Sequence, residues 1–157
     1  SLLDANRTWK YPIDSVGTIY VPQVLVIRSN EHLGYEFLEK PYKIGIVTAA
    51  MNNRPQYDQN FDYAPKSKPM ITDKLKSVLR TAYDNGHDAI VLSAWGCGAF
   101  CNPPLGQSKL WRELLLNDAE FVNKFKKVVF AIFDDHNTGN DHNPFGNYIP
   151  FVQTFNI

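Results

Sequence analysis

Runs of consecutive apolar residues, rich in β-branched side chains, recur along the chain between amphipathic and polar segments. Such runs are typical of strands that are covered on both faces in a largely parallel sheet. They predict strands at residues 18–28, 44–50, 89–95 and 128–133. Pro22 lies inside the first run and has no amide donor, so we expect a bulge or an edge position there.

Helical periodicity is clearest at residues 69–85, where an apolar stripe recurs every three or four positions and Gly86 follows as a stop signal. Shorter helices are expected at 107–116 and 119–125, a helix or turn at 148–155, and the tail of a helix at 2–6. Polar connections are expected at 31–42, 52–68 and 134–147.

Strands that alternate with helices predict an α/β fold, a three-layer α/β/α sandwich with a mixed, largely parallel sheet. The 157 residues suffice for one domain with a substantial core. Ligands of such folds bind where the carboxyl ends of the strands meet. Those ends are Thr48–Ala50, Gly96–Phe100 and Asp134–Asp135, and we expect them to converge at one edge.

The clearest chemical signal is Gly96-Cys97-Gly98-Ala99-Phe100, between a predicted strand and a predicted helix. Glycine allows unusual backbone torsions and close approach of a ligand, and this arrangement exposes backbone N–H groups to an anion. Each hydrogen bond to a charged group contributes about 1.5–3 kcal/mol. Three or four of them on a diphosphate would supply much of the roughly 8 kcal/mol of a micromolar complex. An ordinary tight turn is the alternative interpretation.

Charge and composition narrow the classes of partner. Lys plus Arg and Asp plus Glu number 16 each, which argues against nucleic-acid binding, and no apolar run reaches the length of a membrane span. No signal peptide and no resident cofactor are indicated. Cys97 and Cys101 are too close to form a useful disulfide, so we expect free thiols and an intracellular location, cytoplasmic or nuclear.

Two other candidate sites have simpler interpretations. Cys97 lies in a glycine turn, where a nucleophile is conceivable, but a buried inert thiol is favoured because no histidine is placed nearby in the sequence. A zinc site at the two cysteines lacks further paired ligands. The acidic and histidine residues of 134–142 lack the spacing of a calcium loop and favour a polar surface turn.

Several short motifs occur in a fixed order along the chain. They are Ile19-Tyr20-Val21-Pro22, Val26-Ile27-Arg28, Ile46-Val47-Thr48-Ala49-Ala50, Leu92 to Phe100, Asn102-Pro103-Pro104 and Val128 to Ile132. This set resembles the carboxyl-terminal two-thirds of the microbial-type poly(ADP-ribose) glycohydrolases, a branch of the macrodomains. The resemblance implies a single macrodomain-like domain over residues 1–157 that lacks an amino-terminal portion of the family domain.

The resemblance also implies an ADP-ribose cleft. Gly96, Cys97, Gly98, Ala99 and Phe100 would hold the diphosphate, with Phe100 near the distal ribose. The other ligand-binding positions that it implies are Thr48 and Ala49 on the ribose side, Asn102 beside the loop, and Asp134 with an aromatic residue, Phe145 or Tyr148, toward the adenine.

The chain departs from the family pattern at two points. The catalytic Gln-Glu-Glu of the family occurs nowhere in these residues, and Cys101 stands where the family usually has glycine. Without a positioned carboxylate, general acid–base catalysis worth roughly 10²–10⁴-fold is missing. The leading hypothesis is therefore a non-hydrolytic reader of ADP-ribosylated partners or a sensor of an ADP-ribose-derived signal. The alternatives are a glycohydrolase whose catalytic loop lies in another segment and a degenerate domain kept for protein contacts.

Overall fold

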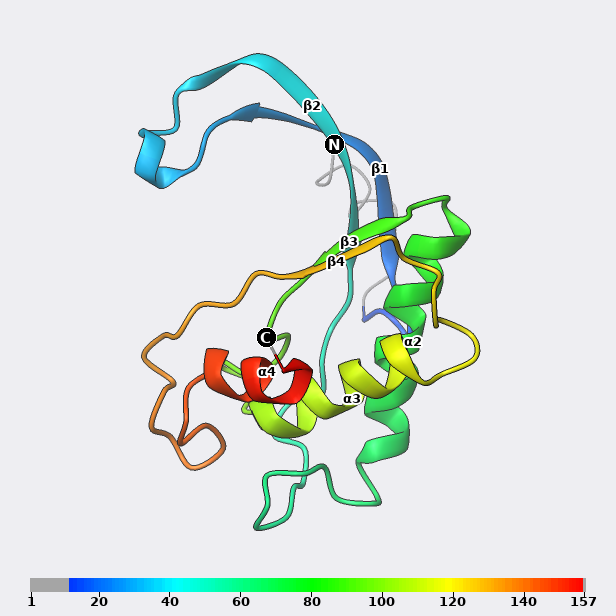
Figure 1. Ribbon diagram of the computed structural model, residues 1–157, viewed down its shortest axis with the longest axis vertical. Helices are drawn as coiled ribbons and strands as arrows, with labels where there is room; N and C mark the ends of the chain where they lie inside the picture. Colours follow the sequence, from blue (N-terminus) through cyan, green and yellow to red (C-terminus); the bar gives the residue numbers. More distant parts are fainter. Residues whose placement is uncertain (1–11, 157) are drawn as a thin grey trace.

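The computed structural model describes residues 12–156, so the expected helix tail at 2–6 lies outside the described residues. Strands and helices alternate along the chain (Figure 1). The elements are β1 (Ile19–Arg28), the 3-10 turn η1 (Glu31–Leu33), β2 (Phe37–Thr48), α2 (Lys68–Asp84), β3 (Ala89–Leu92), α3 (Pro104–Leu116), β4 (Lys127–Phe130) and α4 (Tyr148–Phe155).

β1 and β2 form an antiparallel hairpin whose far end extends away from the helices (Figure 1). The register slips between Val21 and Val24, which confirms the bulge predicted at Pro22, and Gln23 takes a left-handed conformation there. The polar connection predicted at 31–42 is wrong after residue 36, because Phe37 and Tyr42 pair with Arg28 and Val26. Exposed hairpin strands carry polar residues on both faces, and so they lack the apolar run that marks a buried strand.

β3 and β4 pair in parallel, in register from Ala89 with Lys127 to Leu92 with Phe130. Both strands are shorter than the apolar runs that predicted them. Burial on both faces is also a wrong prediction for β3: Leu92 is in the core, but Val91 is 70% exposed. The described residues therefore cover one face of this pair and leave the other open.

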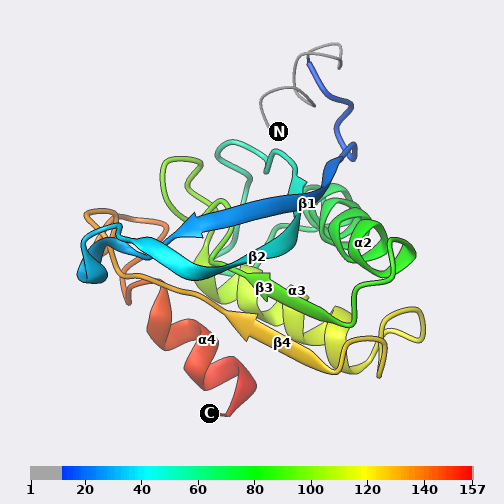
Figure 2. The same ribbon diagram turned by 90° about the horizontal axis from the view of Figure 1, so that it is seen from above.

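The sheet differs from the expected one. The described residues form two separate two-stranded sheets, one antiparallel and one parallel, rather than one largely parallel sheet. In Figure 2 the strands follow one another in the order β1, β2, β3, β4. The α/β class is confirmed, whereas the three-layer sandwich is not, because Val91, Val129 and Phe133 on the open side are exposed.

The helices supply most of the core. The stripe of α2 is buried as predicted, and α3 begins directly at Pro104, where a missing amide hydrogen costs nothing. The helix expected at 119–125 is absent: its backbone forms turns from Asp118 and ends in a left-handed Asn123. The segment at 148–155 is a helix, one of the two predicted possibilities.

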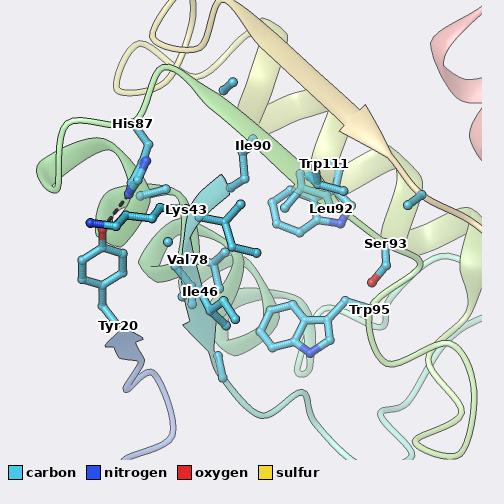
Figure 3. A pocket seen from close by; sticks show the side chains of 18 residues that line it. Tyr20, Lys43, Ile46, Val78, His87, Ile90, Leu92, Ser93, Trp95 and Trp111 are labelled. Atoms are coloured by element: carbon cyan, nitrogen blue, oxygen red, sulfur yellow. Dashed lines mark hydrogen bonds between the residues drawn. The ribbon is translucent and has the colours of Figure 1, made fainter. Parts of the chain in front are cut away.

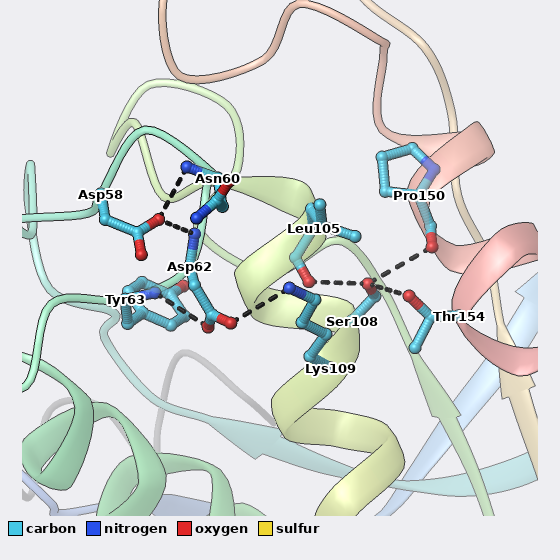
Figure 4. A network of polar contacts seen from close by, with 9 residues as sticks. All are labelled: Asp58, Asn60, Asp62, Tyr63, Leu105, Ser108, Lys109, Pro150 and Thr154. Atoms are coloured by element: carbon cyan, nitrogen blue, oxygen red, sulfur yellow. Dashed lines mark hydrogen bonds and ion pairs between the residues drawn. The ribbon is translucent and has the colours of Figure 1, made fainter.

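α4 is fastened to α3 by a buried hydroxyl (Figure 4). Ser108 Oγ lies 2.7 Å from Thr154 Oγ1, 2.9 Å from the Leu105 carbonyl oxygen and 3.3 Å from that of Pro150. Phe151 of α4 packs into the same core as Trp111 of α3. None of the described helices combines the length and apolar character needed to cross a membrane.

Candidate ligand-binding site

The glycine loop, Gly96 to Phe100, follows β3 and forms a tight turn. Gly96 has a φ of 85°, and a Cβ atom there would lie 2.5 Å from Met51 Cγ, so only glycine fits. The Cys97 amide donates to the Ala94 carbonyl. The amides of Gly98, Ala99 and Phe100 donate to no atom among residues 12–156. Three successive backbone donors are therefore unused, as the predicted anion-binding loop requires.

Asn102 holds this loop in shape from within the core. Its side chain is fully buried, and Nδ2 lies 2.8 Å from the Asn52 carbonyl oxygen, 3.1 Å from that of Gly96 and 3.2 Å from that of Phe100. Its own amide donates to the Gly96 carbonyl. The sequence predicts that Asn102 contacts the ligand, and in the structure it links the segments that follow β2 and β3.

A second buried layer supports Asn102. Tyr63 Oη lies 3.0 Å from Asn102 Oδ1 and 2.6 Å from Gln107 Oε1, but a hydroxyl carries only one proton. Gln107 Nε2 has no partner among the described residues. Turning the Gln107 amide over lets its NH₂ donate to Tyr63 Oη, which then donates to Asn102 Oδ1. Burial raises the pKa of Tyr63 well above its usual value, so it stays a neutral donor.

The long loop at 52–67 forms one wall of the site. The Arg54 amide donates to the Phe100 carbonyl at 2.8 Å, which places this exposed arginine beside the glycine loop. Farther along, Lys109 of α3 binds the Asp62 carboxylate at 3.0 Å (Figure 4). The loop is thus fixed at its start, through Arg54, and near its middle, through Asp62.

The segment at 134–147 forms the opposite wall. His142 is buried, and its Nε2 lies 2.8 Å from the Cys97 carbonyl oxygen, so a ring N–H donates to the glycine loop. Asp135 and Asn137 are bonded to each other and lie above Gly98, where an added Cβ would be 3.7 and 3.5 Å from them. Hydrogen bonds from Asn137 lower the pKa of Asp135, which is therefore ionised.

Asp134 is engaged differently from the expected adenine contact. Its Oδ1 accepts the amides of Asn147 at 2.6 Å and Tyr148 at 2.9 Å, at the start of α4. A carboxylate stabilises a helix at this end because the unpaired amides carry partial positive charge. These bonds position α4, and a ligand contact by Asp134 stays a prediction.

The remaining predicted positions lie at the end of β2 and in the segments that follow β3 and β4. Thr48 ends β2, opposite Ile19 of β1, and Ala49 packs against the core. Phe100 and Phe145 are exposed, and Phe145 meets Phe61 edge-on with the ring centres 5.9 Å apart. Asn102 joins the ends of β2 and β3, and Asp135 reaches the same loop, so the expected convergence of the three strand ends is present.

The thiols do not form a reactive centre. Cys97 is fully buried, and burial, with a smaller effect of Asp135, raises the pKa of its thiol, which favours the inert form. Cys101 is partly exposed and takes a φ of 52°, a conformation that suits glycine. No cluster of three or more metal-binding side chains occurs within residues 12–156.

Sequence reasoning missed the buried polar residues of the site, namely Tyr63, Gln107, His142, Asn143 and Asn147. Three of them, His142, Asn143 and Asn147, lie in the segment expected to be a polar connection, residues 134–147. A weak signal of burial was available, since Pro144-Phe145-Gly146 interrupts the polar residues there, which do not form a continuous charged run.

No protein-family model matches the sequence, and neither does any curated protein sequence. Solved structures do match. Poly(ADP-ribose) glycohydrolase from Deinococcus radiodurans in complex with ADP-ribose is 30% identical, with a TM-score of 0.68 over 88% of this chain and 52% of that one. The glycohydrolase from Thermomonospora curvata bound to the inhibitor ADP-HPD is 29% identical, with a TM-score of 0.68 over 87% of this chain and 48% of that one.

These matches confirm the resemblance that the motifs indicated. The chain is similar to microbial poly(ADP-ribose) glycohydrolases over most of its own length and spans about half of theirs. The fold and the candidate site described above therefore belong to a chain that is similar to these glycohydrolases over most of its length.

We predict that Asn102→Asp destabilises the protein by at least about 2 kcal/mol, because a buried carboxylate would face three carbonyl oxygens and leave them unpaired. Urea denaturation followed by circular dichroism measures this loss. Asn53→Asp makes the same charge change at an exposed position of the loop at 52–67. It is expected to destabilise the protein by less than about 0.5 kcal/mol. Equal losses in the two variants would contradict the role given to Asn102.

We also predict that Cys101→Gly stabilises the protein by roughly 0.5–1 kcal/mol. A left-handed conformation costs a residue with a Cβ about 1–2 kcal/mol, and the greater freedom of glycine in the unfolded chain removes part of that gain. Cys101→Ser, which keeps the Cβ, is the matched control and should not be stabilised. A denaturation midpoint that rises equally for both variants would show that the thiol, not the backbone, is responsible.

Proposed function

We propose that this chain binds ADP-ribose, or a derivative that contains its diphosphate, at the glycine loop. The observation that carries the proposal is the row of three unused amides at Gly98, Ala99 and Phe100, held open by the buried Asn102. Support comes from the similar structures, which hold ADP-ribose or ADP-HPD. Oxygens of a diphosphate would accept hydrogen bonds from these amides.

The charges around the loop orient the ligand. The backbone amide of Arg54 is bonded to the carbonyl of Phe100, so Arg54 lies at that end of the loop. The ionised Asp135 lies over Gly98. A carboxylate repels phosphate but accepts hydrogen bonds from the hydroxyl groups of a ribose. The diphosphate therefore lies toward Ala99 and Phe100, and a ribose lies toward Asp135. The resemblance implies that Asp134 and Phe145 lie toward the adenine, and the proposal keeps this placement.

The chain by itself is proposed to bind without hydrolysis. Cleavage of a glycosidic bond generally needs a carboxyl group that can give a proton to the leaving oxygen. Asp135 is held ionised by Asn137, and one oxygen of Asp134 is occupied by two amides at the start of α4. The carboxylate over Gly98, that of Asp135, is thus not prepared to act as an acid, which favours a reader or sensor of ADP-ribosylated partners or signals.

A second candidate is a poly(ADP-ribose) glycohydrolase whose catalytic glutamate is supplied by another segment. One observation favours it: the similar structures are glycohydrolases, and this chain spans only about half of each. In that case the glycine loop would hold the substrate, while the acid would come from a separate stretch of polypeptide.

We predict that isothermal titration calorimetry detects ADP-ribose binding and that Gly98→Ala weakens it at least tenfold, equivalent to about 1.4 kcal/mol. The added methyl would lie 3.5 Å from Asn137 Nδ2 and 3.7 Å from Asp135 Oδ2, which are ordinary contact distances, so the fold tolerates it. It would, however, fill the space between the loop and Asp135 that the proposal gives to a ribose. Ser93→Thr adds one methyl at an exposed position after β3 and should leave the affinity unchanged. No heat with millimolar ADP-ribose would refute the proposal.

Hydrolysis is tested separately. We predict that the chain releases no ADP-ribose from poly(ADP-ribose) over a prolonged incubation, measured by liquid chromatography, while the Thermomonospora curvata enzyme digests the polymer in parallel. Release that requires the chain and disappears with Gly98→Ala would instead favour the glycohydrolase.

A further inference from the structure

A cavity of about 650 Å³ separates the two sheets (Figure 3). One wall is β2 from Lys43 to Val47, and the other is β3 with Ser93 and Trp95 behind it. We call this cavity the slot. It is distinct from the glycine loop, none of whose residues lines it.

The strands on either side of the slot each have one unpaired edge. Among the described residues, β2 pairs only with β1 and β3 pairs only with β4. Their facing edges therefore present backbone N–H and C=O groups without strand partners, and such edges are templates for another strand. Buried backbone groups are nearly always paired in folded proteins, so a filled slot would have to satisfy them.

The interior of the slot is mostly apolar. Ile46, Val78, Ile90 and Leu92 point into it in Figure 3. Trp111 forms part of its floor, and the buried Nε1 of this residue has no partner in the part of the chain that the structure describes. An apolar occupant that also carries backbone acceptors fits both features.

One end of the slot is closed by a hydrogen bond between the two sheets. Tyr20 Oη of β1 lies 2.6 Å from His87 Nε2, just before β3. Gly45 of β2 passes beneath this pair, and a Cβ there would lie 2.7 Å from His87 Nε2. The bridge joins β1 of one sheet to the start of the other, while strand pairing between β2 and β3 is missing.

We infer that the slot receives one β-strand from a segment that corresponds to the part of the poly(ADP-ribose) glycohydrolases that this chain does not span. Neighbouring strands in a sheet lie about 4.8 Å apart. A single inserted strand would bond to β2 on one side and to β3 on the other. It would thereby join the two sheets into one sheet of five strands. Apolar side chains on the inserted strand would meet the lining of the slot, and residues beyond it would cover the exposed Val91 and Val129.

The choice of occupant rests on two observations. About half of each similar structure lies outside the match with this chain, which is enough polypeptide for several strands and helices. A small apolar ligand would fill the volume but leave both strand edges unpaired, which costs roughly 1–3 kcal/mol for each buried group. A second copy of this chain is another possible occupant, and the experiment distinguishes it.

The test mixes this chain with a separate polypeptide, namely the half of the Thermomonospora curvata glycohydrolase that lies outside the match, and repeats it with the Deinococcus radiodurans half. We expect a one-to-one complex by light scattering. Amide hydrogen exchange within 43–47 and 89–92 should slow at least tenfold on binding. Val91→Lys, at the rim of the slot, should weaken the complex at least tenfold, whereas Val122→Lys, an equally drastic change at a partly exposed residue away from the slot, should not.

A complex without new protection in both strands would overturn the inference, as would the absence of a complex with both halves. Self-association that protects the same strands would assign the slot to a second copy and equally overturn it. None of these readouts uses ADP-ribose, so the outcome is independent of whether the glycine loop binds that ligand.

Discussion

The buried amide of Asn102 is the constraint on which the candidate site depends. Two N–H groups serve three carbonyl oxygens, from Asn52, Gly96 and Phe100, so the segments after β2 and β3 cannot separate without leaving polar groups unpaired in the core. These bonds occupy the carbonyls of Gly96 and Phe100, while the amides of Gly98, Ala99 and Phe100 stay unused among the described residues. Tyr63 and Gln107 complete the network, and their burial makes it costly to disturb.

An open row of amides attracts any anion, so the surrounding side chains must supply selectivity. Arg54 is bonded through its amide to Phe100, at the end of the glycine loop, and Asp135 lies over Gly98, at its middle. This separation of charges suits a molecule that is anionic in one part and rich in hydroxyl groups in another. Inorganic phosphate has the anionic part but lacks the hydroxyl-rich part that would bond to Asp135. In the proposed complex the carboxylate of Asp135 would meet the sugar rather than the phosphate, so its place next to the glycine loop is compatible with the binding of a diphosphate.

Local signals carried much of what sequence analysis could predict. The stripe of α2, the bulge at Pro22 and the glycine loop each depend on a few neighbouring residues, and the structure confirms them. The errors concern long-range partners. The apolar run of β3 predicts a strand covered on both sides, but whether Val91 is covered depends on which segments are present, not on β3 itself. His142 resembled a surface residue because its partner, the Cys97 carbonyl, is 45 positions away.

The two proposals meet at one edge of the molecule. β2 and β3 both lead into the candidate site, where Asn102 joins the residues that follow them. A strand inserted between them in the same direction would end at this edge as well, and the residues after it would emerge beside the glycine loop. The proposed ligand binding depends on contacts within this chain, whereas the glycohydrolase alternative takes its catalytic acid from another segment. Under the two proposals binding and hydrolysis are separable, because the first needs only this chain and the second needs a further segment.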